Sequence, residues 1–183
     1  MLIGLGTQKQ VGKDSFYKII CSNYPFLPIK RLAFADPLKM EIYSHMLEPY
    51  GLPYDLIENK DISRLLLQSW GEFRRRTISP NYWVDRLAEQ LIDVDKNIYV
   101  ITDVRYENEA EFVKKNSGFL IKIVRGSDNY QDSHSSEQSL LGYQGFDLVL
   151  ENNSTFEKFE QDVLSVFKNN ILDKFVGNVL QQT

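Results

Sequence analysis

The first fifteen residues constrain the fold most, because an apolar strand at Met1–Gly6 runs into a glycine- and amide-rich turn that opens a helix at Lys13. Backbone N–H groups of such a turn and of the first helical turn point toward a common centre, and the helix dipole adds partial positive charge there. A lysine at the helix start can reach the outer phosphates of a polyphosphate as a point charge. The turn is therefore predicted to bind phosphate groups.

The turn departs from the phosphate-binding pattern G-x-x-x-x-G-K-[ST] in two places. Thr7 stands where the first glycine belongs, and Asp14 replaces the hydroxyl residue after the lysine. A carboxylate repels a triphosphate unless Mg²⁺ lies between them, so Asp14 is predicted to hold the ion, with the Ser15 hydroxyl as the competing ligand. The alternative is an ordinary strand-to-helix turn in which Asp14 only complements the helix dipole.

Strand-like and helix-like runs alternate along the chain, which predicts an α/β fold with a mostly parallel five-stranded sheet and helices on both faces, in three layers. The expected strands are Met1–Gly6, Ile29–Phe34, Asn97–Thr102, Phe119–Val124 and Asp147–Leu150. The expected helices are Lys13 to Asn23, a helix capped by Asp36 and running to about Glu48, about Asp61 to Arg76, Asn81 to Val94, a Glu-rich helix after the third strand, and a last helix capped by Ser154 with Glu157.

The length and composition of the chain predict how it is organised. The 183 residues, 43% of them hydrophobic, suit one globular domain. Its core is expected at 1–35 and 95–183, with consecutive helices at about 36–94 forming an insertion that binds a second substrate. The polar loop at about 126–140 is predicted to cover a bound nucleotide as a lid, and a solvated loop without a role is the alternative.

Charge and cysteine content bear on partners and location. Acidic residues outnumber basic ones by 25 to 21, which argues against a nucleic-acid polymer as partner. The single cysteine, Cys21, suits a reducing compartment, and neither a secretory signal nor a membrane span is recognised. We expect a cytoplasmic protein with no membrane partner, and a homodimer is left open.

The third expected strand ends in two side chains suited to phosphate chemistry. Ligands of doubly wound sheets bind outside the carboxyl ends of the strands, so Asp103 and Arg105 should lie beside the turn. Arg105 has the fork geometry for a phosphate, Asp103 could anchor Mg²⁺ or orient an acceptor, and Glu109 could brace Arg105. The alternatives are an Asp–Arg ion pair without a ligand and, for Glu109, a solvated helix face.

Further cations and aromatic side chains could serve an acceptor. An enzyme that brings a phosphorylated acceptor to a triphosphate must neutralise several negative charges, so arginines should converge. The candidates are Arg64, Arg74, Arg105 and Arg125, together with Lys39. For Arg74 the alternative is to complement the helix dipole, and for Trp70, Phe73, Tyr82 and Trp83 it is core packing instead of base stacking.

Several short motifs occur in the order seen in bacteriophage deoxynucleoside monophosphate kinases, and the chain resembles that family over most of its length. These motifs are Gly12-Lys13-Asp14-Ser15, Ala35-Asp36-Pro37-Leu38-Lys39, Leu67-Gln68-Ser69-Trp70-Gly71, Tyr82-Trp83-Val84, Thr102-Asp103-Val104-Arg105 with Asn108-Glu109, and His134-Ser135-Ser136-Glu137. The resemblance implies a P-loop kinase fold that moves the γ-phosphoryl of ATP to a deoxynucleoside monophosphate with Mg²⁺, and a location in the host cytoplasm if the protein is viral.

By that likeness two sets of residues are expected to face the substrates. ATP would be contacted by Lys9, Gln10, Gly12, Lys13, Asp14 and Ser15, to which Val11 and Arg125 are added. The acceptor would be contacted by Lys39, Arg64, Gly71, Glu72, Asp103, Arg105 and Glu109, to which Leu38, Gln68, Arg74 and Trp83 are added. Lys13, Asp103 and Arg105 are the expected catalytic residues, and no general base is needed because an acceptor phosphate is already ionised.

Two other functions stay open at this point. Animal-type phosphomevalonate kinase shares a Gly-Lys-Asp loop, a segment like Trp70-Gly71-Glu72 and a strand ending in Asp-x-Arg, but its acceptor has no base. The chain also departs from the phage family at Thr7 and Gln10 and has a shorter helical region. A non-catalytic protein that senses a nucleotide and regulates a partner is the alternative of another class.

Overall fold

The computed structural model describes residues 1–6, 10–126, 139–140 and 142–180, with the backbone alone at residues 60 and 178–180. The chain divides into two compact units, one formed by Met1–Leu32 with Leu91–Thr183 and the other by Ala33–Gln90. We call them the sheet unit and the helical unit and describe each by itself. That they act as the core and the acceptor-binding insertion of a single kinase domain stays a prediction.

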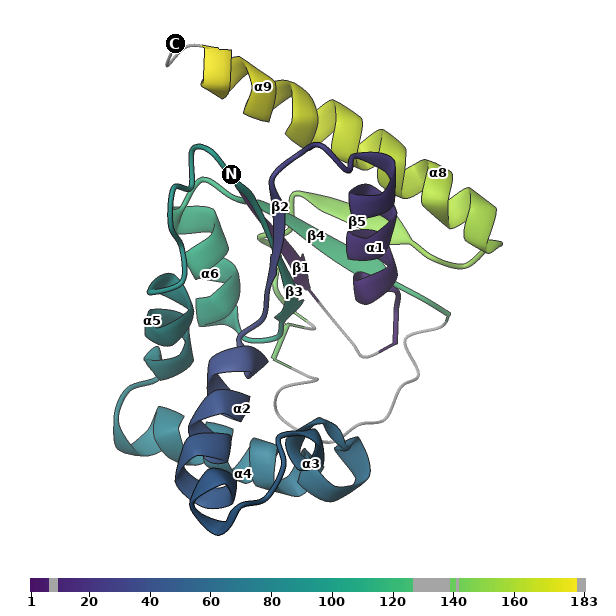
Figure 1. Ribbon diagram of the computed structural model, residues 1–183. Helices are drawn as coiled ribbons and strands as arrows, with labels where there is room; N and C mark the ends of the chain where they lie inside the picture. Colours follow the sequence, from purple (N-terminus) through teal and green to yellow (C-terminus); the bar gives the residue numbers. More distant parts are fainter. Residues whose placement is uncertain (7–9, 127–138, 141, 181–183) are drawn as a thin grey trace. The chain divides into compact units, whose positions relative to one another are not determined.

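The sheet unit contains five parallel strands in the order β2-β3-β1-β4-β5 (Figure 1). Their bounds are β1 Leu2–Gly6, β2 Ile29–Leu32, β3 Ile98–Val104, β4 Phe119–Val124 and β5 Leu148–Glu151. The predicted α/β class with a five-stranded sheet is confirmed. β2 ends two residues earlier than expected, because the chain turns at Ala33, whose carbonyl accepts the N–H of Asp36 at 3.1 Å.

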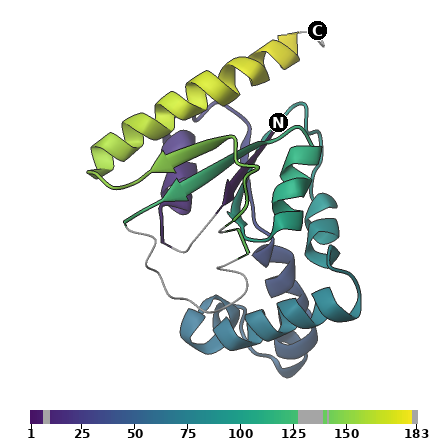
Figure 2. The ribbon, with the colours of Figure 1, turned by 180° about the vertical axis from the view of Figure 1, so that it is seen from behind.

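Helices cover both faces of this sheet, because the central strands β1, β3 and β4 are mostly apolar and their alternate side chains point to opposite faces. Ile3 and Leu5 of β1 belong to a buried cluster with α1 and α8, whereas Gly4 faces α6 (Figures 1 and 2). A Cβ at Gly4 would lie 2.9 Å from Val113 Cγ2, so glycine permits α6 to approach the sheet. These helices are α1 Lys13–Asn23, α6 Glu107–Lys115 and α8 Phe156–Phe167, with η3 Lys168–Leu172 and α9 Asp173–Leu180 continuing from α8.

The predicted start of α8 and the predicted end of the helix after residue 81 are wrong for local reasons. Thr155, not Ser154, caps α8, since the Thr155 hydroxyl accepts the N–H of Lys158 at 3.3 Å. The helix expected at Asn81–Val94 is α5, Tyr82–Ala88, and it stops early because Glu89 and Gln90 form a turn and the residues after them are not helical. One of these, Asp93, has a positive φ of 52°.

The helical unit has no strand between residues 33 and 90, as expected. The three helices predicted there are present with shifted ends, and the structure adds a short helix at Asp55–Glu58 that was not predicted. The prediction that Asp36 caps α2 is wrong, because that helix begins at Ala35 and Asp36 lies in its first turn. Pro37 lies in the same turn, where the N–H that proline lacks would have no partner within the helix. Gly51, with φ +68°, ends the continuation of α2. The elements are α2 Ala35–Ile42, η1 Tyr43–Leu47, η2 Glu48–Tyr50, α3 Asp55–Glu58, α4 Lys60–Thr77 and α5.

Across the described residues, the structure contains no helix with both the length and the apolar character that crossing a membrane requires.

Candidate active site

The last residues of the turn that precedes α1, Val11 and Gly12, contact side chains that follow β5. Gly12, the residue before α1, has φ +114°, and a Cβ there would lie 2.7 Å from Asn152 Nδ2 and 3.2 Å from Phe159 Cζ. The same Asn152 amide donates to the carbonyl of Val11 at 2.9 Å. Gln10 also has a positive φ, 59°. Only glycine fits at position 12, and the residues around it are fixed by a side chain that follows β5. The predicted ATP contact Lys9 lies outside the described residues.

Lys13 is the first residue of α1, and its side chain is only 8% exposed. A cation in the first turn is the reverse of what the helix dipole favours, and burial of an ammonium adds a further cost. This position therefore gives no help to helix stability, and the role of Lys13 as a phosphate ligand stays a prediction. Asp14 beside it is exposed and Ser15 is half-buried. The predicted metal ligands thus lie at consecutive positions of this turn.

The strand register brings the end of β3 to the start of the turn. Gly6, the last residue of β1, pairs with Val104 of β3. Asp103 and Arg105 lie on either side of Val104, so both lie close to the point where the turn begins. Val104 is buried, whereas Asp103 and Arg105 are half-buried. The structure therefore brings Asp103 and Arg105 to the same sheet end as the turn that carries Lys13.

Glu109 fixes the backbone at this sheet end. Its side chain is 2% exposed, and Oε2 accepts the backbone N–H groups of Arg105 at 2.8 Å and of Tyr106 at 3.2 Å. Unpaired N–H groups at a helix start are costly when buried, and a carboxylate in the first turn of α6 also complements its dipole. Glu109 thus holds the main chain from which the Arg105 side chain departs.

Arg125 lies directly after β4 and is exposed. The next residue, Gly126, has φ +74° and donates its N–H to Asn153 Oδ1 at 2.7 Å. The predicted lid at about 126–140 falls mainly on 127–138, outside the described residues, and so does the motif His134-Ser135-Ser136-Glu137. The predicted contact of Arg125 with ATP stays a prediction.

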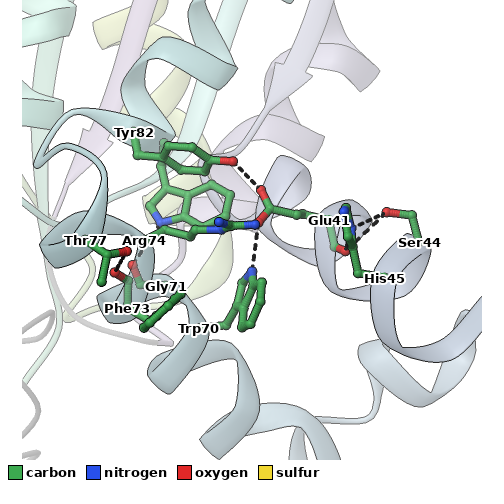
Figure 3. A network of polar contacts seen from close by, with 10 residues as sticks. Glu41, Ser44, His45, Trp70, Gly71, Phe73, Arg74, Thr77 and Tyr82 are labelled. Carbon is green, nitrogen blue, oxygen red and sulfur yellow. Dashed lines mark hydrogen bonds and ion pairs between the residues drawn. The ribbon is translucent and has the colours of Figure 1, made fainter.

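In the helical unit, one carboxylate joins three helices (Figure 3). Glu41 of α2 accepts hydrogen bonds from Trp70 Nε1 at 2.9 Å and Arg74 Nε at 2.5 Å, both on Oε1, and from the Tyr82 hydroxyl on Oε2 at 2.7 Å. The Arg74 guanidinium lies 4.8 Å from the centre of the Trp70 ring and 5.6 Å from that of Tyr82. We call these four residues the Glu41 network.

The Glu41 network keeps its carboxylate ionised. Burial alone would raise the pKa of Glu41, but the hydrogen bonds from Tyr82, Trp70 and Arg74, with the charge of Arg74, outweigh it and lower the pKa below its ordinary value. Sequence reasoning missed this residue because an isolated glutamate on an amphipathic helix has no motif. The aromatic residues and Arg74 were named, but nothing in the sequence connects them to α2.

The lowered pKa gives a prediction for stability. Because the folded-state pKa of Glu41 lies below its unfolded value, the stabilisation is present at neutral pH and is lost as the pH falls through the folded pKa. The melting temperature of wild type should therefore exceed that of Glu41→Gln most near neutral pH, and the difference should shrink in acid. Thermal melts over a pH series measure this, with Glu111→Gln, at an exposed site, as control. A difference independent of pH would contradict it.

Several other predicted acceptor residues have partners within the helical unit. Lys39 Nζ contacts both carboxylate oxygens of Glu58 at 3.0 Å, and Glu72 pairs with Arg76 at 2.6 Å. Trp83 is 1% exposed and donates Nε1–H to the Gly71 carbonyl at 3.0 Å, which matches the core alternative.

The remaining acceptor candidates lie on α2 and α4. A Cβ at Gly71 would lie 3.4 Å from Leu38 Cδ2, so α2 and α4 pack closely there. On α4, Arg64 is exposed and Gln68 is half-buried. Contacts of all these residues with an acceptor stay predictions.

Comparisons with known proteins agree on one family. The family model described as deoxynucleotide monophosphate kinase matches residues 54–163. An inferred deoxynucleotide monophosphate kinase of Acanthamoeba polyphaga mimivirus is 30% identical over 193 aligned positions, which cover 92% of this chain and 97% of that protein. The deoxynucleotide monophosphate kinase of Escherichia phage RB69 is 26% identical, and the alignment covers 78% of this chain and 61% of that protein.

Among solved structures, an inferred kinase from Chloroflexus aurantiacus aligns with 91% of this chain and 93% of its own, at 13% identity and a TM-score of 0.44. The assignment stands instead on the sequence relatives. The family model spans more than half of the chain, and the mimivirus protein aligns over nearly the whole of both sequences. The chain belongs to the deoxynucleotide monophosphate kinase family.

Proposed function

We propose that this kinase transfers the γ-phosphoryl group of ATP to a deoxynucleoside monophosphate, with Mg²⁺, and releases a deoxynucleoside diphosphate and ADP. The observation that carries the proposal is the pairing of Gly6 with Val104. It brings an arginine and an aspartate to the sheet end from which a glycine-dependent turn leads to a buried lysine. Such a grouping of opposite charges suits the transfer of one phosphoryl group between two anions.

The sheet unit binds ATP in this proposal. Backbone N–H groups of residues 10–15 face the phosphates, and the Lys13 ammonium neutralises charge on the outer ones. Gly12 matters because its missing Cβ lets the turn close over Asn152 and Phe159. Residues 11 and 12 are thereby held before ATP arrives, so little reorganisation of this part of the turn accompanies binding.

The residues at the start of α1 fit a magnesium ion. Mg²⁺ takes oxygen ligands and usually binds through one or two carboxylates together with substrate phosphates. Asp14 supplies an exposed carboxylate and Ser15 a hydroxyl at the next position. Bound there, the ion would neutralise charge on the β- and γ-phosphates and orient them.

The acceptor phosphate is held by guanidinium groups. Arg105 offers a planar fork of N–H donors, and Glu109 fixes the main chain from which it departs. The attacking phosphate oxygen is ionised at neutral pH, so Asp103 orients the acceptor and takes no proton. Catalysis then consists of alignment for in-line transfer and stabilisation of the charge in flight.

A coupled ADP-release assay tests the proposal. Purified protein with ATP and Mg²⁺ is given the four common deoxynucleoside monophosphates, modified ones and, separately, phosphomevalonate. We expect multiple-turnover ADP release with at least one deoxynucleoside monophosphate and none with phosphomevalonate. Turnover with phosphomevalonate alone would contradict the proposal, and so would less than one ADP per protein with every acceptor despite tight nucleotide binding, which would indicate a nucleotide sensor.

A further inference from the structure

The Arg74 guanidinium group donates a hydrogen bond within the helical unit through Nε, and its terminal nitrogens lie at the other edge of the group. Nε donates to Glu41 Oε1, and the rings of Trp70 and Tyr82 lie against the group. Within the described part of the chain the terminal nitrogens Nη1 and Nη2 have no hydrogen-bond acceptor, although the side chain is only 22% exposed. The structure therefore orients a guanidinium group and leaves its two-pronged edge available to a ligand.

Glu41 orients this guanidinium group, and most of the hydrogen-bonding capacity of its carboxylate is used within the helical unit. Its side chain is 11% exposed, and its two oxygens accept three donors from α4 and α5. An arginine side chain otherwise has many rotamers, and fixing one before binding removes an entropic cost from the binding step. The carboxylate also keeps the charge of Arg74 from being buried without a counter-ion.

We propose that Glu41 is a positioning residue, which holds Arg74 so that its terminal edge binds the phosphate of the acceptor nucleotide. This rests on the proposed function, since the acceptor is taken to be a deoxynucleoside monophosphate. Two parallel N–H donors match the two oxygens of a phosphate, and the phosphate is the only anionic group that all deoxynucleoside monophosphates share. Glu41 thereby sets affinity for the acceptor without touching it.

The competing explanation is that Glu41 only joins α2, α4 and α5. A purely structural carboxylate would affect the fraction of folded protein, which scales kcat, and would leave KM unchanged. A positioning residue instead raises KM for the acceptor and leaves KM for ATP unchanged. The two explanations therefore separate in steady-state kinetics even when a variant is less stable.

The test compares wild type with Glu41→Gln, Arg74→Ala and the double variant, at saturating ATP. We expect KM for the deoxynucleoside monophosphate to rise about 10-fold in Glu41→Gln, by a similar factor for every base accepted. The double variant should match Arg74→Ala, because Glu41 acts through Arg74. Glu48→Gln is the matched control: it makes the same change at an exposed glutamate of the helical unit outside the Glu41 network, so its KM should stay within about 2-fold of wild type.

Several results would overturn the inference. They are an unchanged acceptor KM in Glu41→Gln, a rise confined to one base, and additive effects in the double variant. If Glu41→Gln yields no folded protein, Arg74→Lys decides, because it keeps the charge and loses the fork, and an unchanged KM there also overturns the inference. Wild type inactive with every deoxynucleoside monophosphate would instead defeat the proposed function itself, and with it the premise of the inference.

Discussion

Replacement of Lys13 by methionine is expected to lower kcat/KM for ATP by about 10³-fold. Methionine has a similar length and suits a side chain that is 8% exposed, so the turn should keep its shape while it loses the charge. The lost interaction is with phosphate groups whose charge rearranges during transfer, so kcat should fall along with binding. Initial rates of ADP release over a range of ATP concentrations measure both.

Lys18→Met is the matched control for Lys13→Met. Lys18 lies on the same helix, and its side chain is exposed to solvent. A surface lysine in the middle of the helix contributes little to stability or to a site at the start of the helix, so activity should stay within about 2-fold of wild type. Equal losses in the two lysine variants, or near-full turnover in Lys13→Met, would remove the lysine from the mechanism.

The second large effect is expected at Arg105. An arginine that stabilises a phosphoryl group in flight can be worth about 10³- to 10⁵-fold in rate, so Arg105→Ala should lower kcat by a factor in that range. Arg105→Lys keeps the charge and loses the fork, and it should recover only part of the loss. Single-turnover measurements with enzyme in excess over ATP separate this chemical step from product release.

The matched control for Arg105 is Lys115→Ala. Lys115 is an 80% exposed cation on α6, the helix that follows Arg105, and its contact with Glu111 at 4.0 Å is a surface pair of small energy. Its removal should leave kcat unchanged and the fold intact. An Arg105→Ala protein that keeps wild-type kcat would show that the residue serves only the structure of the sheet end.

The sheet unit was largely predictable from the sequence, because its signals are local. Buried strands appear as continuous apolar runs such as Ile98–Ile101. Both ends of α1 were predicted, from the glycine before it and from its apolar spacing. Helix caps were less predictable, since Ser154 and Thr155 are both good capping residues and the backbone selects one of them. The end of α5 was missed because helix propensity does not identify the turn that begins at Glu89.

In the candidate site, too, the parts that depend on local sequence were predictable and the parts that depend on packing were not. The turn with Lys13 and the strand end with Arg105 follow from short motifs whose chemistry depends on residues close in sequence. The Glu41 network does not, because its members lie up to 41 residues apart and meet only through the packing of α2, α4 and α5. Sequence reasoning named Arg74 as a phosphate ligand without seeing the carboxylate that orients it.

The central claim is that the turn after β1 binds ATP and that its γ-phosphoryl group passes to a deoxynucleoside monophosphate. The most direct test uses ATP labelled in the γ-phosphoryl group and follows the label after incubation with wild type and with Lys13→Met. The account predicts that wild type transfers the label to the deoxynucleoside diphosphate and that Lys13→Met transfers almost none in the same time. Label released only as inorganic phosphate, or equal transfer by both proteins, would contradict it.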